Sequence, residues 1–164
     1  MAKKQNAWHT TGHAPSEYPS QDHDMVRYLV LRKYSDQRYD IDIEPWVTDT
    51  DFAGKGIITP AHFSYYGSGA VIGWQALPLP ITADPEGWMS PYRGDDDPGV
   101  SGMYLCTTTR DNVRFEVKEA YWDCQKSRWF RLREREEVLA WRKFPSIPSQ
   151  AALASYSLMA TPSR

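Results

Sequence analysis

Hydrophobic and polar residues alternate along two stretches of the chain, with the period of two that is typical of a half-buried β-strand. In residues 38–44 and again in residues 114–118, apolar side chains stand between charged ones. An apolar run precedes each stretch, at 26–32 and at 103–109, and a short connector containing Asp or Asn separates the run from the strand. Because Asp and Asn favour turns, each run and its following strand are expected to form an antiparallel hairpin.

A third apolar segment follows each hairpin. It spans Ala70–Trp74 in the first half of the chain and Glu137–Arg142 in the second. A proline comes shortly afterwards in both halves, Pro78 and Pro145. Proline has no backbone N–H to donate to a sheet, so these residues mark where the strand has ended. The pattern predicts two sets of three antiparallel strands.

The two sets of strands belong to an internal repeat. Shifted by 76 positions, residues 28–47 fall on residues 104–123 with four identities and four close substitutions. Further along the chain the matching positions lie 67 residues apart, and near the N-terminus they lie 80 residues apart. The matched tryptophans are Trp8 with Trp88, Trp46 with Trp122, and Trp74 with Trp141. The predicted fold is therefore mainly β, with a β-rich α+β fold as the alternative.

The repeat also predicts the organisation of the chain as two pseudo-equivalent three-stranded units. Units of this size are marginally stable alone, so the two are expected to pack together. Ser149 is a suitable helix cap and Pro162 cannot continue a helix, so the tail is expected to be a short helix unless it frays. The predicted segments are a flexible N-terminus (1–6), repeat unit 1 (7–80), a linker (81–86), repeat unit 2 (87–148) and the C-terminal tail or short helix (149–164).

Composition and charge narrow the classes of function. The 164 residues are 41% hydrophobic and 13% aromatic, which excludes a wholly disordered chain. The net charge of −2 disfavours nonspecific nucleic-acid binding, which needs a strongly basic face. No apolar run approaches the roughly 18 residues of a membrane span, and no apolar stretch follows the N-terminal basic pair as in a secretory signal. The two cysteines are too few for a disulfide framework, so a cytoplasmic protein is expected.

Three groups of side chains could in principle ligate a metal ion. The histidines lie in a stretch that Gly12 and Pro15 make unsuitable for a helix, so no pair shares a helical face. The aspartates adjoin turn signals, where solvated acidic residues are common. The sequence therefore predicts no metal, no cofactor and no catalysis, with a metal-dependent hydrolase that uses the aspartates as the alternative. The groups are His9, His13 and His23, then Asp49 and Asp51, then Asp95, Asp96 and Asp97.

Aromatic and basic residues outside the matched positions are the candidates for binding a partner. The repeat accounts for six of the seven tryptophans and leaves Trp129 between basic and aromatic neighbours. Unit 1 carries nine extra residues within 53–69, including three aromatic ones. Arginine mixed with aromatics is common in interface hot spots and in single-strand binders, the alternative being that these rings cover the core. The candidates are Phe63, Tyr65, Tyr66, Trp129, Phe130, Arg131 and Arg133.

Six segments of the chain share a pattern with one family of small proteins. They are Gly87–Ser90, Met103–Thr107, Ala120–Asp123, Arg128–Phe130, the closing Val138–Pro145 and its counterpart Val71–Pro78 in unit 1. These segments resemble the small-protein family of phages and prophages that is known as domain of unknown function 551. The resemblance implies a shared fold and a phage origin, and it implies no activity. The segment 94–99 departs from the family's pattern.

This resemblance, the missing catalytic set and the aromatic candidates lead to a hypothesis of function. The chain is expected to be a phage-encoded binding protein in the host cytoplasm that inhibits a host defence complex by protein–protein contact, as anti-CRISPR proteins do. One alternative is a sponge that sequesters a nucleotide signal against Arg131 and Arg133, in a groove between the units. Another is a single-stranded nucleic-acid binder that uses Arg128–Arg133, which the acidic residues of unit 1 disfavour.

Charge segregation adds a further possibility for assembly. Residues 36–51 contain six acids and one arginine, whereas residues 128–143 contain six bases and three acids. Surfaces of opposite charge favour association. A head-to-tail homodimer, in which the acidic segment of one copy meets the basic segment of the other, is therefore a further alternative.

Overall fold

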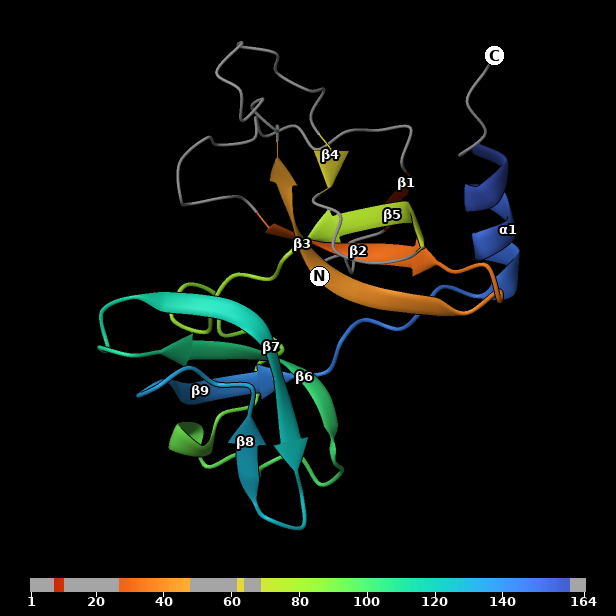
Figure 1. Cartoon of the computed structure of the whole chain (residues 1–164). Helices are drawn as coiled ribbons and strands as arrows, with labels where there is room; N and C mark the ends of the chain where they lie inside the picture. The colour runs from red at the N-terminus through yellow and green to blue at the C-terminus, as the bar shows by residue number, and fades with distance from the viewer. Residues whose placement is uncertain (1–7, 11–26, 48–61, 64–68, 160–164) are drawn as a thin grey trace. The chain divides into compact units, whose positions relative to one another are not determined.

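The computed structural model describes residues 8–10, 27–47, 62–63 and 69–159 (Figure 1). In these residues the protein is mainly β, with two antiparallel sheets and one C-terminal α-helix, as the periodicity predicts. The chain divides into two compact units, whose bounds differ from those of the predicted repeat units. From here on, unit 1 means Met1–Leu77 with Ile147–Arg164, and unit 2 means Pro78–Ser146. No helix among the described residues is long and apolar enough to cross a membrane.

Unit 1 contains a five-stranded sheet in the order β1-β5-β2-β3-β4. The predicted hairpin forms β2 and β3, and the predicted third strand forms β5 beside β2. Two very short edge strands, β1 and β4, enlarge the predicted set of three. The elements are β1 (His9–Thr10), β2 (Arg27–Lys33), β3 (Tyr39–Val47), β4 (His62–Phe63), β5 (Ala70–Ala76) and the helix α1 (Gln150–Met159).

Unit 2 contains a four-stranded sheet in the order β8-β7-β6-β9. The hairpin of β6 and β7 and the third strand β9 are the predicted three, and the short β8 is added at the edge beside β7. A single 3₁₀ turn, η1, precedes β6. The elements are η1 (Pro91–Arg93), β6 (Gly102–Thr109), β7 (Phe115–Asp123), β8 (Arg128–Phe130) and β9 (Glu137–Arg142).

The two sheets share one register, which confirms that the units are pseudo-equivalent. The hairpin pairs of unit 1 recur in unit 2 with a shift of 76, and the third-strand pairs recur with the shift of 67 found in the sequence. Since a slip by one residue would exchange the buried and exposed faces of a strand, the shared register places equivalent side chains on equivalent faces. Equivalent pairs are Tyr28–Glu44 and Tyr104–Ala120 in the hairpins, and Val30–Trp74 and Cys106–Trp141 across the third strands.

A β-bulge occurs at the same place in both sheets. The register between the first and third strands shifts between Leu31 and Arg32 in unit 1, and between Thr107 and Thr108 in unit 2. A bulge adds one unpaired residue to a strand and increases its local twist. The two units therefore share an irregularity of the sheet as well as its regular pairs.

The edge pairs are equivalent too. His9 pairs with Trp74 in unit 1, and Met89 bridges to Trp141 in unit 2, which corresponds to the shift of 80 that matched Trp8 with Trp88. On the opposite edge, the loop before the short strand differs in length. Fourteen residues (48–61) separate β3 from β4, whereas four (124–127) separate β7 from β8.

Among the described residues, four Tyr, Trp or Phe rings pack on one face of each sheet. In each cluster a tyrosine of the first strand meets a tryptophan of the third edge to face, with ring centroids 5.2 Å apart in both units. Such pairs contribute about 0.5–1.5 kcal/mol beyond the area they bury. The clusters are Tyr28, Trp46, Phe63 and Trp74 in unit 1, and Tyr104, Trp122, Trp129 and Trp141 in unit 2.

The helix α1 contributes to a second cluster of unit 1. Leu153 is 4% exposed and packs with Leu31 and Ile72 of the sheet. Ser149 caps the helix as expected, because its Oγ accepts a hydrogen bond from the N–H of Ala152 at 3.4 Å. Leu153, near the start of the helix, thus attaches α1 to the sheet of unit 1.

Replacing Leu153 by alanine should lower the free energy of unfolding by about 2–3 kcal/mol, because it removes a buried side chain and leaves a cavity. Urea denaturation monitored by tryptophan fluorescence measures the change. Gln150→Ala, an exposed substitution in the same helix, serves as the control and should change stability little. Equal stabilities of the two variants would contradict the packing of α1 on the sheet.

Candidate functional site

The structure gives two of the sequence-predicted candidates a place in the core. Phe63 lies opposite Trp46 with ring centroids 4.8 Å apart, and Trp129 lies opposite Trp122 at 5.0 Å. Since Trp46 and Trp122 are equivalent, Phe63 and Trp129 are equivalent as well. The interpretation of these two rings as additions to the repeat is therefore wrong, because each is the fourth ring of its aromatic cluster.

The remaining aromatic candidates of unit 1, Tyr65 and Tyr66, lie outside the described residues. The same holds for four of the residues considered as metal ligands, His13, His23, Asp49 and Asp51.

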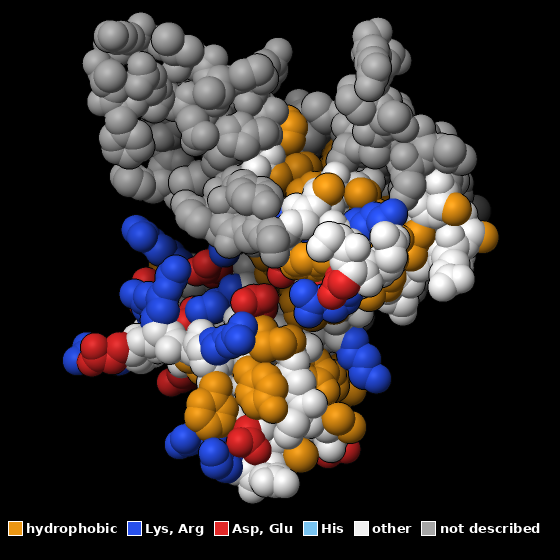
Figure 2. Space-filling view, turned by 45° about the vertical axis from the view of Figure 1, so that its right-hand side comes forward, with side chains coloured by type: hydrophobic (Ala, Val, Ile, Leu, Met, Phe, Trp, Pro, Cys, Tyr) orange, Lys and Arg blue, Asp and Glu red, His pale blue; other side chains and the backbone are white. Residues whose placement is uncertain are grey.

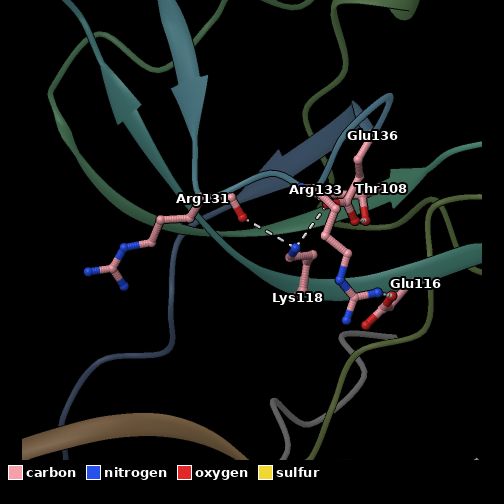
Figure 3. A network of polar contacts seen from close by, with 6 residues as sticks. All are labelled: Thr108, Glu116, Lys118, Arg131, Arg133 and Glu136. Carbon is pink, nitrogen blue, oxygen red and sulfur yellow. Dashed lines mark hydrogen bonds and ion pairs between the residues drawn. The ribbon is translucent and has the colours of Figure 1, made fainter.

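The arginines Arg131 and Arg133 point to different sides of the sheet (Figure 3). Arg131 has a left-handed backbone, with φ of 63°, and its guanidinium lies 3.3 Å from Oε1 of Glu119. The Arg133 guanidinium lies 3.5 Å from Oε2 of Glu116. Because Glu116 and Glu119 are an odd number of residues apart on β7, they face opposite sides. The two arginines do not form one continuous anion-binding stripe.

A buried polar network fixes the segment between β8 and β9 (Figure 3). Oε2 of Glu136 accepts hydrogen bonds from the N–H of Arg133 at 2.7 Å and from Nζ of Lys118 at 3.0 Å. Its Oε1 accepts a bond from the Thr108 hydroxyl at 2.8 Å, and Nζ of Lys118 also donates to the Arg131 carbonyl at 3.3 Å. Burial alone would raise the pKa of Glu136, but these donors outweigh it and hold the pKa below its ordinary value.

Unit 1 has a polar network at the equivalent place, with the charge at its centre reversed. Arg32, which is 1% exposed, follows the bulge as Thr108 does in unit 2. Its Nε donates to Oε1 of Glu44 at 2.6 Å and its Nη1 donates to the Gly69 carbonyl at 2.8 Å. Burial, which outweighs the attraction of Arg32, raises the pKa of both Asp42 and Glu44. Both networks contain an ion pair and attach a loop to the sheet.

The acidic run before β6 also has structural contacts. Oδ2 of Asp95 accepts a hydrogen bond from the N–H of Ser90 at 2.8 Å, and the Asp96 carbonyl accepts one from Nε1 of Trp141 at 3.3 Å. In the described part of the chain, no three His, Cys, Asp or Glu side chains are grouped so that they could hold a metal ion.

An exposed patch of aromatic and basic side chains lies on the β7–β8 hairpin. Tyr121 is 36% exposed and stands opposite Phe130 in the sheet, with ring centroids 6.5 Å apart. The Arg128 guanidinium lies 4.3 Å from the centre of the Phe130 ring, and the Lys126 ammonium lies 5.4 Å from it. Figure 2 shows exposed hydrophobic side chains with basic and acidic neighbours on unit 2. These four residues with Arg131 are called the hairpin patch below.

Hydrogen bonds hold the turn of this hairpin. Oδ1 of Asp123 accepts bonds from the N–H groups of Gln125 at 3.0 Å and Lys126 at 3.2 Å. These bonds outweigh partial desolvation and lower the pKa of the Asp123 carboxyl. The N–H of Cys124 donates to Oγ of Ser101 at 2.9 Å, which fastens the turn to the segment before β6. The hairpin patch is therefore displayed on an ordered turn.

The sequence contained a signal for the hairpin patch at a matched position of the repeat. Tyr121 corresponds to Pro45 at the shift of 76, and the pairing of the edge strands makes His62 the counterpart of Arg128. The residues singled out from the sequence lie at positions without a counterpart in the other repeat. A comparison of residue types at the matched positions would have identified Tyr121 as a candidate for binding as well. No family model, curated protein or solved structure matches this chain.

Replacing Trp129 by alanine should lower the free energy of unfolding by about 3 kcal/mol, because a ring packed in the aromatic cluster is lost. Phe63→Ala should destabilise unit 1 for the same reason. Thermal unfolding followed by near-UV circular dichroism measures both effects. Full retention of stability in either variant would show that its ring lies outside the core.

Glu136→Gln should make stability depend less on pH. The pKa of Glu136 lies below its ordinary value of 4.5, so the ionised carboxylate stabilises the fold above that pH, and this contribution is lost as the pH falls through the folded pKa. At neutral pH the variant should be less stable by about 1–3 kcal/mol, and the difference should shrink in acid. Urea denaturation between pH 3 and pH 7 measures it, with the exposed Glu134→Gln as the control. A difference that stays constant across this range would contradict the assigned role.

Proposed function

We propose that this chain is a non-enzymatic binding protein that acts by protein–protein contact through the hairpin patch. The observation that carries the proposal is the difference between equivalent positions of the two units. The aromatic clusters and the bulge recur in both, whereas Tyr121 stands where unit 1 has Pro45. Because unit 1 forms the same sheet with another residue there, the fold does not require an exposed tyrosine at this position.

The chemistry of the hairpin patch supports contact with a protein. Tyrosine and arginine are enriched among the residues that dominate interface energies, since both combine apolar area with directional hydrogen bonds. Tyr121 and Phe130 lie on paired strands, and the turn between the strands is ordered by Asp123. An ordered surface loses less conformational entropy on binding, so a small patch of this kind can contribute usefully to affinity.

The proposed biological role is inhibition of a host defence complex by a phage-encoded protein, in the manner of an anti-CRISPR protein. Its support is the resemblance of segments within 71–78 and 87–145 to a small-protein family of phages and prophages. The nucleotide sponge is less well supported, since Arg131 and Arg133 point to different sides of the sheet. Single-strand binding is also less well supported, because acids neutralise both of these arginines.

The test is affinity capture from a bacterial host lysate with the full chain and its variants. A stoichiometric host protein should be captured by the wild type and by Tyr92→Ala, an exposed control in the same unit. Tyr121→Ala and Phe130→Ala should each weaken that complex by more than about 1 kcal/mol, measured by calorimetry with the purified partner. Circular dichroism verifies that both variants are folded.

Three outcomes would contradict the proposal. A nucleotide released when the purified protein is denatured would favour the sponge. A bound oligonucleotide would favour single-strand binding. Unchanged partner affinity in both folded variants would mean that the interface lies elsewhere.

A further inference from the structure

We infer that the hairpin patch recognises an acidic segment of its partner protein and that Arg128 binds a carboxylate of that segment. This inference rests on the proposed function, because it requires the hairpin patch to be a protein-binding surface. It adds the chemical class of what is bound and the residue that selects it.

The first argument is the distribution of charge around the hairpin. Lys126 has Asp123 at 3.6 Å, and Arg131 has Glu119 at 3.3 Å. Arg128 is exposed and has no ion pair with any of the described residues, although Asp123 stands opposite it in the sheet. The carboxylate of Asp123 accepts hydrogen bonds from the turn and pairs with Lys126 instead, so it makes no ion pair with Arg128.

The second argument is the orientation of Arg128. Its guanidinium lies over the Phe130 ring at 4.3 Å from the ring centre, a geometry that restrains a long side chain. A guanidinium stacked on a ring still presents its N–H groups around its edge, and two of them can bind both oxygens of one carboxylate. Phe130 therefore holds Arg128 in place for an incoming acid.

The third argument separates an acidic protein segment from a nucleic acid. A nucleic-acid strand carries a phosphate at every nucleotide, and its binding needs several cations along a path. Among the described residues, Arg128 is the cation of the hairpin patch that makes no ion pair, and Glu119 and Asp123 would repel neighbouring phosphates. An isolated carboxylate beside an apolar residue fits better, since Tyr121 supplies exposed aromatic area close to Phe130.

The test selects ligands for the full-length protein from a random library of displayed peptides. The best binders are synthesised with fluorescent labels, and their affinity is measured by anisotropy. We expect enrichment of Asp and Glu next to apolar residues. Converting these acids to Asn and Gln should weaken binding about tenfold, the loss expected for one charge-assisted contact. Arg128→Gln should cause a similar loss, and Arg114→Gln, an exposed control at the β6–β7 turn, should cause none.

The outcomes distinguish this inference from the proposed function. Peptides that need Tyr121 but neither acids nor Arg128 would overturn the inference and leave protein binding by the hairpin patch intact. Peptides that need neither Tyr121 nor Arg128, or a library without binders, would overturn both. A labelled oligothymidine that binds more tightly than the best peptide, and that loses affinity with Arg128→Gln, would assign the hairpin patch to nucleic acid and overturn both.

Discussion

The register of the first hairpin against the third strand is the constraint on which each unit depends. A slip of one residue would turn every buried side chain of a strand toward solvent. Both units keep the same pairs and the same bulge even though only four of twenty matched positions are identical. The aromatic rings meet at equal distances in the two clusters because the backbone brings equivalent positions together.

The bulge also explains why a buried polar network recurs beside it. The residue that follows the bulge is Arg32 in unit 1 and Thr108 in unit 2, and each takes part in a bond to the loop that precedes the third strand. Burying a charge is costly unless it is paired. The charge at the centre is positive in one unit and negative in the other, so what the position requires is a polar connection to that loop and not a particular sign.

Much of the fold was predictable because its long strands have a clear period of two and their tryptophans recur in order. The edge strands were not, since β4 and β8 have two and three residues and show no periodicity. Trp129 escaped the match because the loops before it and before Phe63 differ in length. The separation of Arg131 from Arg133 depends on the left-handed backbone at Arg131, which interrupts the alternation of faces and has no signature in composition.

Reversal of the buried charge has a consequence for how the chain folds. Adjacent units of similar sequence can exchange strands during folding, and such misassembly is a characteristic failure of repeat proteins. If β2 paired with β7 in the register of β6, Lys118 and Ala120 would stand where its own unit offers Asp42 and Glu44, so the buried Arg32 would lose two acidic partners and gain a like charge beside it. The opposite exchange would bring Glu136 toward Asp42. The first strand of each unit is therefore matched electrostatically to the second strand of its own unit, so the correct assembly is favoured although both sheets share one pattern.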